Sequence, residues 1–374
     1  MAAVDRLSSL PPELLADVFG LAAEHSTPLK EPLSRTLLPY FRETLYRRVH
    51  FASEKSLSRF AAAILAQSFL GLLVRELRAP TGWPRVEHHA RNTGLVHHLT
   101  RLLYLDNVTF EFDAIHFSSF SRLSQLRSLS YKCTGLGPRH LEQLVHLVSL
   151  TSLEIRFFTT DACELESARF GSLELPQVTH LSLKCLDTWL EDTRNSWDRH
   201  FARFVDRFPR LESLTLDDVR MPRFSGILGH LSIATQTLKS LVLRSPASGP
   251  ALPSYRCDHF LPRFRHLELV DLCQHTVSHA LGIFLAQLPE LAFLRLGPNT
   301  HFDIDAQALV ATIGDPRQTP SLQLFKFDAI WGAYGKPLQP DAVQFFTLRG
   351  DGWVEPRLGE WELDDLHRLD EVAQ

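Results

Sequence analysis

Histidine pairs and two aspartates come nearest to a chemical site in this sequence. The adjacent histidines at positions 88–89 and 97–98 suggest a metal site, and Asp303 and Asp305 stand two residues apart. Neighbouring side chains on a helix or strand point in different directions, and no cysteine completes the spacing of a zinc ligand set. Asp305 also stands directly before the helix-like AQALVATI, where it would cap a helix. We therefore expect no metal and no cofactor.

The sequence contains none of the common catalytic motifs. It has no GxSxG nucleophile elbow, P-loop, dinucleotide-binding GxGxxG or HExxH. Serine, histidine and aspartate are too frequent for a catalytic triad to be chosen without geometry. The five cysteines are odd in number and form no CxxC pair, so we expect reduced, partly buried thiols. These features favour a protein that is not an enzyme.

Composition and charge bear on the class of partner. The chain is 44% hydrophobic and 22% charged, which is ordinary for a globular protein, and its formal net charge of −4 argues against nucleic-acid binding. No run of 18 apolar residues occurs, and Asp5 and two prolines stand where a secretory signal would be apolar. We expect a cytoplasmic or nuclear protein that binds neither membrane nor nucleic acid.

An apolar pattern at offsets 0, 3, 5 and 8 recurs through most of the chain. Its eleven copies begin at Tyr46, Val74, Thr100, Leu126, Leu150, Val178, Leu211, Leu238, Phe264, Leu291 and Leu322. They span 276 residues in ten intervals, a mean period of 27.6 residues. Offsets 3 and 5 point to one face of a short strand, which cannot bury that face alone. Successive copies must therefore stack into a parallel sheet.

The repeats define the expected core. Between the strands, residues 137–150, 198–209, 277–289 and 305–313 have helical apolar spacing, and prolines at 209, 262 and 289 precede the next strand. The pattern predicts that Leu181, Leu183, Leu214 and Leu216 are buried and that Ser182 and Thr215 are open. The chain resembles leucine-rich-repeat proteins, which implies an α/β solenoid shaped as a horseshoe, with parallel β-strands on its concave face and helices on its convex face.

The residues before the first repeat carry a second resemblance. Ser9 can cap a helix whose residues Leu14, Leu15, Val18, Phe19 and Ala22 fall on one face. The stretch resembles the F-box signature through Leu10, Pro11 or Pro12, Glu13, Leu14, Leu15, Val18 and Phe19. The order of an F-box followed by leucine-rich repeats is similar to that of the expanded fungal F-box families. The family implies a Skp-type adaptor and a cullin as partners. The implied adaptor-binding residues are Leu10, Pro11, Leu14, Leu15, Val18, Phe19, Leu37 and Leu38.

The domain organisation follows from these two patterns. We expect an all-α F-box-like segment at residues 1–45, a solenoid of about eleven irregular repeats at 46–335, and a C-terminal cap and tail at 336–374. The N-terminal segment departs from the F-box pattern, because its middle is short and no tryptophan closes it. It could alternatively act only as the N-terminal cap of the solenoid, because terminal repeats need covers of atypical sequence.

The open face of the sheet is the expected binding surface. At offset 6 of successive copies, Lys132, Arg156 and Lys184 form a basic ladder, and Arg244 and Tyr104 also point outward. The ladder could hold an acidic or phosphorylated protein substrate, or it could be ordinary solvated charge. We expect the substrate-recognition subunit of an SCF-type cullin ubiquitin ligase. A repeat scaffold unconnected to ubiquitin is the alternative, and an enzyme with a scattered site is the third.

Overall fold

The structure of this chain is a computed structural model that divides into two units. The N-terminal unit comprises residues 1–134 and 139–153, and the C-terminal unit comprises residues 135–138 and 154–374. The structure describes residues 38–51, 53–83, 95–110, 122–133, 142, 144–157, 173–185, 196–217, 228–244, 258–273, 276–277, 281–296, 301–302, 321–327, 344–349 and 352–354.

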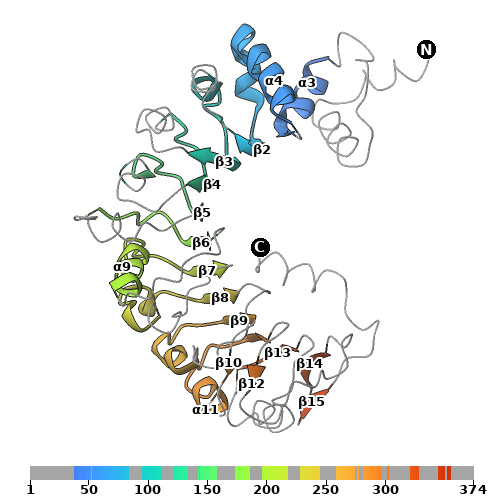
Figure 1. Ribbon diagram of the computed structural model, residues 1–374. Coiled ribbons are helices and arrows are strands. Elements are labelled where there is room, and N and C mark those ends of the chain that lie inside the picture. The colour runs from blue at the N-terminus through green and yellow to red at the C-terminus, as the bar shows by residue number, and fades with distance from the viewer. Residues whose placement is uncertain are drawn as a thin grey trace. The chain divides into compact units, whose positions relative to one another are not determined.

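The N-terminal unit begins with helices and continues as parallel strands (Figure 1). Its elements are α3 (Leu38–Arg47), β1 (Arg48–His50), α4 (Glu54–Ala66), the 3-10 helix η1 (Ser68–Leu73), β2 (Glu76–Trp83), β3 (Tyr104–Phe110) and β4 (Ser128–Cys133). Each strand pairs in parallel with the next in chain order. A further strand, β5 (Ser152–Phe157), contains the boundary between the two units.

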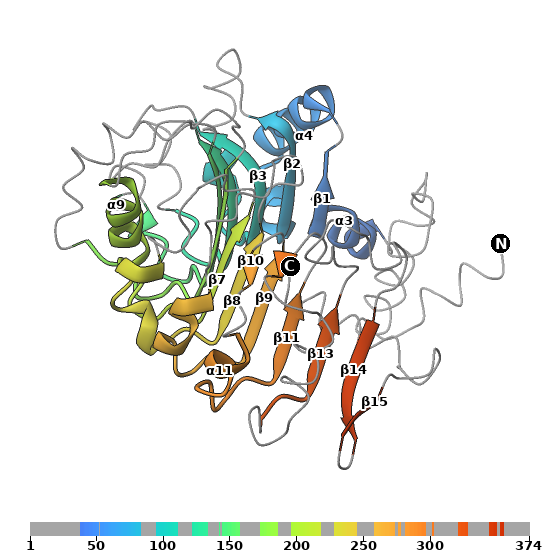
Figure 2. The same ribbon diagram turned by 60° about the horizontal axis from the view of Figure 1, so that its bottom comes forward.

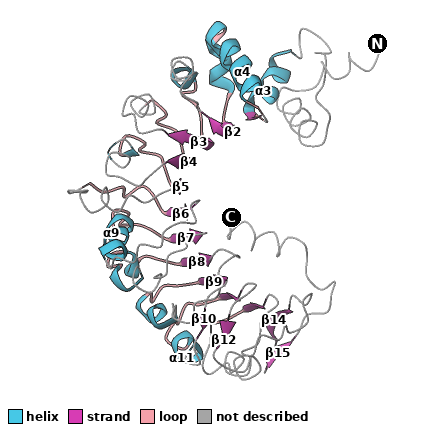
Figure 3. Cartoon of the chain, viewed as in Figure 1, coloured by secondary structure: helices cyan, strands magenta, loops and turns pink. Residues whose placement is uncertain are grey.

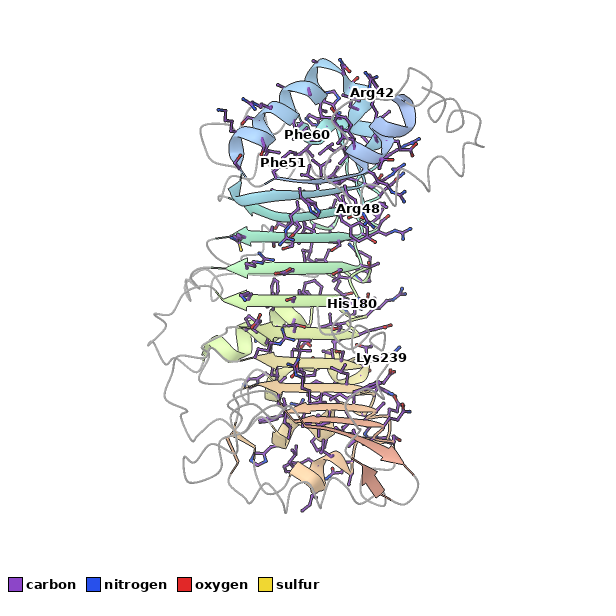
Figure 4. The ribbon with its side chains drawn as sticks, turned by 90° about the vertical axis from the view of Figure 1, so that its right-hand side faces the viewer. Arg42, Arg48, Phe51, Phe60, His180 and Lys239 are labelled. Atoms are coloured by element: carbon purple, nitrogen blue, oxygen red, sulfur yellow. The ribbon has the colours of Figure 1, made fainter. Side chains whose placement is uncertain are left out.

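Helix α4 shows how the first repeat forms. Ser53 caps the helix, because its Oγ accepts a hydrogen bond from the Ser56 amide at 3.3 Å. Leu57, Phe60 and Ile64 follow at helical spacing and are buried. The Phe60 ring lies 5.0 Å from that of Phe51, and both labels mark the same end of the ribbon in Figure 4. Because Phe51 directly follows β1, an aromatic contact joins the helix to the end of the first strand.

The C-terminal unit is a longer series of parallel strands that closes with an antiparallel pair. Its elements are β6 (His180–Cys185), α9 (Ser196–Val205), β7 (Ser213–Asp217), η3 (Ala234–Gln236), β8 (Ser240–Arg244), η4 (Asp258–Arg263), β9 (Leu269–Cys273), β10 (Thr276–Val277), α11 (Leu281–Leu285), β11 (Phe293–Leu296), β12 (His301–Phe302), β13 (Leu324–Phe327), β14 (Gln344–Arg349) and β15 (Gly352–Val354). Strands β7, β8, β9, β11 and β13 lie side by side (Figure 2). Helices and strands occupy different sides of this unit (Figure 3).

Backbone hydrogen bonds set the stacking of one repeat on the next. The carbonyl oxygen of Thr179 accepts the amides of Glu212 and Ser213 at 2.8 and 3.0 Å. The Glu212 carbonyl in turn accepts the amides of Lys239 and Ser240 at 2.7 and 2.9 Å. The same doubled contact recurs in both units, so each strand begins at a fixed place on its predecessor. Parallel pairing of short strands in this way makes each unit a leucine-rich-repeat solenoid.

The expected core is confirmed in β6 and β7. Leu181 is 2% exposed, and Leu183, Leu214 and Leu216 are fully buried. Ser182 and Thr215, which alternate with these leucines, are half-buried on the other face. The repeat pattern therefore predicted correctly which face of these strands forms the core. We call the opposite face of each sheet its open face.

Two copies of the pattern were placed in the wrong register. In β9, Val270 pairs with Leu241 and Leu272 pairs with Leu243, so the copy begins at Leu267 rather than Phe264. Phe264 and Leu269 satisfy the same apolar spacing, which made the two registers indistinguishable in sequence.

The copy expected from Thr100 needs a similar correction. Leu105 pairs with Leu129, so this copy begins at Leu102. Leu103 instead lies directly before β3, where its carbonyl accepts a hydrogen bond from the Arg127 amide at 2.8 Å. Tyr104 keeps its outward direction but pairs with Ser128, two positions from the column expected for it.

The helical expectations are confirmed in part. Helix α9 overlaps the expected segment 198–209 but begins two residues earlier, and α11 lies within 277–289, whereas shorter 3-10 helices take this place in other repeats. Pro262 lies inside η4 and does not follow a finished helix. The segment 305–313 and residues 1–37 lie outside the described residues, so the domain limits expected at residues 45 and 335 stay predictions.

Two polar side chains connect neighbouring repeats beside the short helices. The Asp206 carboxylate accepts the Ser232 amide at 3.1 Å and the Ile233 amide at 3.0 Å, just before η3. The Arg263 guanidinium donates to the carbonyls of Leu228, Gly229 and Leu231. Each side chain reaches back or forward by one repeat and occupies backbone groups that a short helix leaves without partners.

Candidate functional site

The open face of the N-terminal unit combines ion pairs with an exposed aromatic ring. Arg48 Nε lies 3.1 Å from Glu76 Oε1, and Arg78 Nε lies 3.1 Å from Asp106 Oδ2. Both pairs join neighbouring strands, because Arg48 is the register partner of Glu76 and Arg78 is the register partner of Asp106. Tyr104 follows Glu76 in the next strand and is 44% exposed. An exposed tyrosine among fixed charges is typical of protein-binding surfaces.

The open face of the C-terminal unit carries a second series of cross-strand pairs. Lys184 Nζ lies 3.2 Å from Asp217 Oδ2, its register partner on β7. Asp217 is in turn the register partner of Arg244 on β8. Such pairs each contribute about 0.2–1 kcal/mol on an open sheet face. Their larger effect is to fix charged groups in known positions, which is useful for recognition.

Asp271 is the most buried charge among the described residues of this face. Its side chain is 2% exposed, and its Oδ2 lies 3.4 Å from Arg244 Nη2 and 3.6 Å from Arg295 Nη1. The two arginine side chains are 31% and 30% exposed, so part of each reaches solvent. The carboxylate therefore orients two guanidinium groups on β8 and β11 toward the open face. The sequence reasoning missed Asp271, because the wrong β9 register placed Glu268 at this position.

The expected basic ladder has acidic neighbours. Arg156 Nε lies 2.5 Å from Glu154 Oε1 on its own strand, and Lys184 pairs with Asp217. Lys132 lies half-buried on β4. Recognition of an acidic substrate by these residues stays a prediction. Its electrostatic basis is weaker than the sequence indicated, because carboxylates lie beside Arg156 and Lys184.

Some positions of the open faces are nevertheless buried. Val242 is 1% exposed and Ser130 is 6% exposed. Val242 is the register partner of Asp271, and Arg244 of the same strand reaches across to that carboxylate. This ion pair therefore lies next to Val242 on the same face.

The histidines and aspartates considered as a metal site are only partly described. Residues 88–89 and Asp303 and Asp305 lie outside the described residues. Among the residues that the structure describes, no group of three His, Cys, Asp or Glu side chains could hold a metal. Burial lowers the pKa of His97, and the charges of Arg122 and His98 lower it further. His97 is therefore mainly neutral at pH 7.

The expected thiols and adaptor-binding residues are described only in part. Cys133 is buried and forms no disulfide. The adaptor-binding residues from Leu10 to Leu37 lie outside the described residues, and Leu38 is the first residue of α3. Within the described part of the chain, no helix is long and apolar enough to span a membrane.

Comparisons with known proteins add three structures of low similarity. No protein-family profile and no curated protein sequence matches the chain. The chain is similar to the leucine-rich-repeat-containing protein LegL7 from Legionella pneumophila at 12% identity and a TM-score of 0.42, covering 71% of this chain and 86% of that one. The chain is also similar to an internalin (inlF) of Listeria monocytogenes at 13% identity and a TM-score of 0.35, covering 87% of this chain and 92% of that one. The similarity to the leucine-rich-repeat domain of APL1B has 12% identity and a TM-score of 0.30, covering 86% of this chain and 70% of that one.

Proposed function

We propose that this chain is the non-enzymatic substrate-recognition subunit of an SCF-type cullin ubiquitin ligase in the cytoplasm or nucleus. The N-terminal segment binds a Skp-type adaptor through the apolar stripe Leu14, Leu15, Val18 and Phe19, together with Leu10, Pro11, Leu37 and Leu38. The open face of the repeats binds a protein substrate. The two tasks are carried by different parts of the chain, so each can be removed without the other.

The observation that carries the substrate-binding half is the open face itself. Its side chains are not needed for the core, yet cross-strand ion pairs hold them in fixed positions on rigid strands. Tyr104 adds exposed aromatic surface in one unit, and the guanidinium groups of Arg244 and Arg295 add partly exposed charge in the other. Such a surface suits a polar protein segment. The adaptor half is supported by the resemblance of residues 10–19 to an F-box.

The first experiment is affinity purification of the tagged chain followed by mass spectrometry. Wild type should recover a Skp-type adaptor and a cullin, and Leu15→Asp with Phe19→Asp should lose both. Each lost side chain removes about 1.5–3 kcal/mol if fully covered by the adaptor. Ile283→Asp is the matched control, because Ile283 is 61% exposed on α11 and lies outside the N-terminal segment. Absence of adaptor and cullin from the wild-type sample would refute the ligase proposal.

The second experiment tests the substrate surface. Changing Lys132, Arg156 and Lys184 to Gln removes three charges without placing like charges beside Glu154 and Asp217. The proposal expects loss of a distinct set of acidic interactors with adaptor recovery kept. A control of equal charge change uses three exposed residues away from the open-face strands: Lys55→Gln, Arg59→Gln and Arg210→Gln. Identical interactors for both variants would leave these three cations as ordinary surface charge.

The runner-up is a protein-interaction scaffold unconnected to ubiquitin. It is favoured by the same open face, and it gives the N-terminal segment only a capping role. The two proposals differ in one result: the scaffold retains its interactors when Leu15 and Phe19 are both changed to Asp, and it recovers no cullin.

A further inference from the structure

An exposed apolar patch lies on the helices of the N-terminal unit. Leu45 on α3, Leu65 at the end of α4, and Phe69 and Leu72 on η1 are 50%, 43%, 47% and 41% exposed. We call these four residues the apolar patch. They make up four of the seven large hydrophobic residues that are exposed among the described residues. Exposed apolar side chains gathered in this way indicate a docking surface.

The geometry brings Leu45, Phe69 and Leu72 of the apolar patch together, and Leu65 lies on α4 four residues before Phe69. Helix α3 packs on η1, and the Arg42 guanidinium lies over the Phe69 ring at 5.9 Å from its centre. Leu45 follows Arg42 by three residues and thus shares its side of α3. Phe69 and Leu72 are also three residues apart, which is one turn of a 3-10 helix, so they point the same way. Arg42 and Leu45 therefore face the same surface as Phe69 and Leu72.

We propose that the apolar patch is the docking site of this chain's own residues 10–22, and that this contact competes with the adaptor. The competing role rests on the proposed function, whereas the intramolecular contact does not. The apolar stripe that the sequence predicts on residues 10–22 is the same stripe that would face the adaptor. It cannot be covered by both at once, so docking reduces adaptor affinity in proportion to the docked fraction.

The size of the apolar patch favours a tethered occupant. Four partly exposed side chains offer a few hundred Å², whereas a stable interface between separate proteins buries about 800 Å² per partner. A second copy of the chain would therefore find too little surface here. A segment of the same chain needs less, because tethering supplies an effective concentration of about 1 mM or more.

The length and polarity of the N-terminal residues also fit. Residues 23–37 separate the proposed helix from α3, and a 15-residue link reaches at most about 50 Å. Residues 10–24 contain Glu13, Asp17 and Glu24 and no Lys or Arg. On a helix these three acids fall on the side opposite to Leu15 and Phe19, so docking leaves them in water. The segment can cover the apolar patch without burying a charge.

Hydrogen exchange followed by mass spectrometry on the purified full-length chain, with no adaptor present, tests the docking. A helix of about 13 residues is marginal in water by itself, so the amides of residues 10–22 should be protected only if the segment is docked. Wild type should exchange at least about tenfold more slowly there than an unstructured peptide. Leu45→Ser with Phe69→Ser should remove this protection. Ile283→Ser, the matched change at an exposed apolar residue of α11, should retain it.

Protection of the strands serves as the folding control, because amides of β3 and β4 must stay protected in every variant that is compared. If the double change unfolds this region, Leu45→Ser alone provides the comparison. Unprotected residues 10–22 in wild type, or protection that survives the change of the apolar patch, would overturn the docking.

The competition is tested separately, by measuring the affinity of purified Skp-type adaptor for wild type and for the double variant. The double variant Leu45→Ser with Phe69→Ser should bind the adaptor more tightly than wild type, because the segment is released. Equal or weaker binding with docking shown by hydrogen exchange would overturn the competition alone. Complete absence of adaptor binding in wild type and variant would refute the proposed function and leave the intramolecular contact standing.

Discussion

Asp206 provides a quantitative test of how neighbouring repeats are joined. Its carboxylate accepts hydrogen bonds from the Ser232 amide at 3.1 Å, the Ile233 amide at 3.0 Å and the Ser232 hydroxyl at 2.7 Å. Asp206→Ala removes all three and leaves two amides near η3 without an acceptor. Loss of a capping side chain costs about 0.5–2 kcal/mol, and hydrogen bonds to a charged group contribute about 1.5–3 kcal/mol each.

The expected cost is smaller than the sum of these contributions, because Ser232 is exposed and water can replace the carboxylate there. We expect Asp206→Ala to lower the free energy of unfolding by about 1–2 kcal/mol and Asp206→Asn, which keeps one acceptor oxygen, by about half as much. Urea unfolding followed by circular dichroism measures both variants. The change should also be local, because each repeat of a solenoid contacts only its neighbours.

Hydrogen exchange locates the effect. The amides of residues 228–240 should exchange faster in Asp206→Ala, while those of β2 to β4 should be unchanged. Equal stability of wild type, Asp206→Ala and Asp206→Asn would refute the reasoning, because it would mean that the carboxylate contributes nothing to the joint between repeats.

Four further substitutions test the packing of the strands and their surroundings. Leu214→Ala should cost about 2–5 kcal/mol because the side chain is fully buried, whereas Thr215→Ala on the open face should stay within about 0.5 kcal/mol in the same urea titration. Gly71→Ala should cost about 1–3 kcal/mol, because an added Cβ would clash with the backbone carbonyl of His98, and a normal thermal transition would contradict that packing. Burial, followed by the effect of nearby Cys133, raises the pKa of Tyr131 well above its ordinary value. As pH rises, the Tyr131 hydroxyl therefore loses its proton in the unfolded chain before it does so in the folded chain. The contribution of Tyr131 to the free energy of unfolding should be fully present below about pH 10 and decrease above it, and Tyr131→Phe should make this decrease smaller.

The sequence was sufficient to predict the buried positions of strands in which only one register fits the apolar pattern. Leu181 and Leu214 are separated by a full repeat with unambiguous apolar spacing, and both are buried as expected. In β9 the residues Phe264, Leu267 and Leu269 mimic the spacing of the true set, which starts at Leu267. Only pairing with β8 distinguishes the two registers, and pairing is a property of neighbouring repeats rather than of one copy.

The candidate surface was harder to predict than the core. Core positions need only be apolar, whereas an ion pair depends on the register of two strands and on the reach of both side chains. The missed Asp271 shows the consequence: one register error displaced the carboxylate that orients Arg244 and Arg295. Likewise Glu154 beside Arg156 was visible in sequence, but a contact between residues two apart on a strand became evident only in the structure.

Titration of the purified chain with a purified Skp-type adaptor, measured by calorimetry, tests the proposed function most directly. We expect saturable binding to wild type, loss of binding for Leu15→Asp with Phe19→Asp, and retained binding for Ile283→Asp. The variant with Leu45→Ser and Phe69→Ser should bind more tightly than wild type. Absence of binding by wild type, or equal binding by the variant with Leu15→Asp and Phe19→Asp, would contradict the role of the N-terminal segment as the adaptor-binding element.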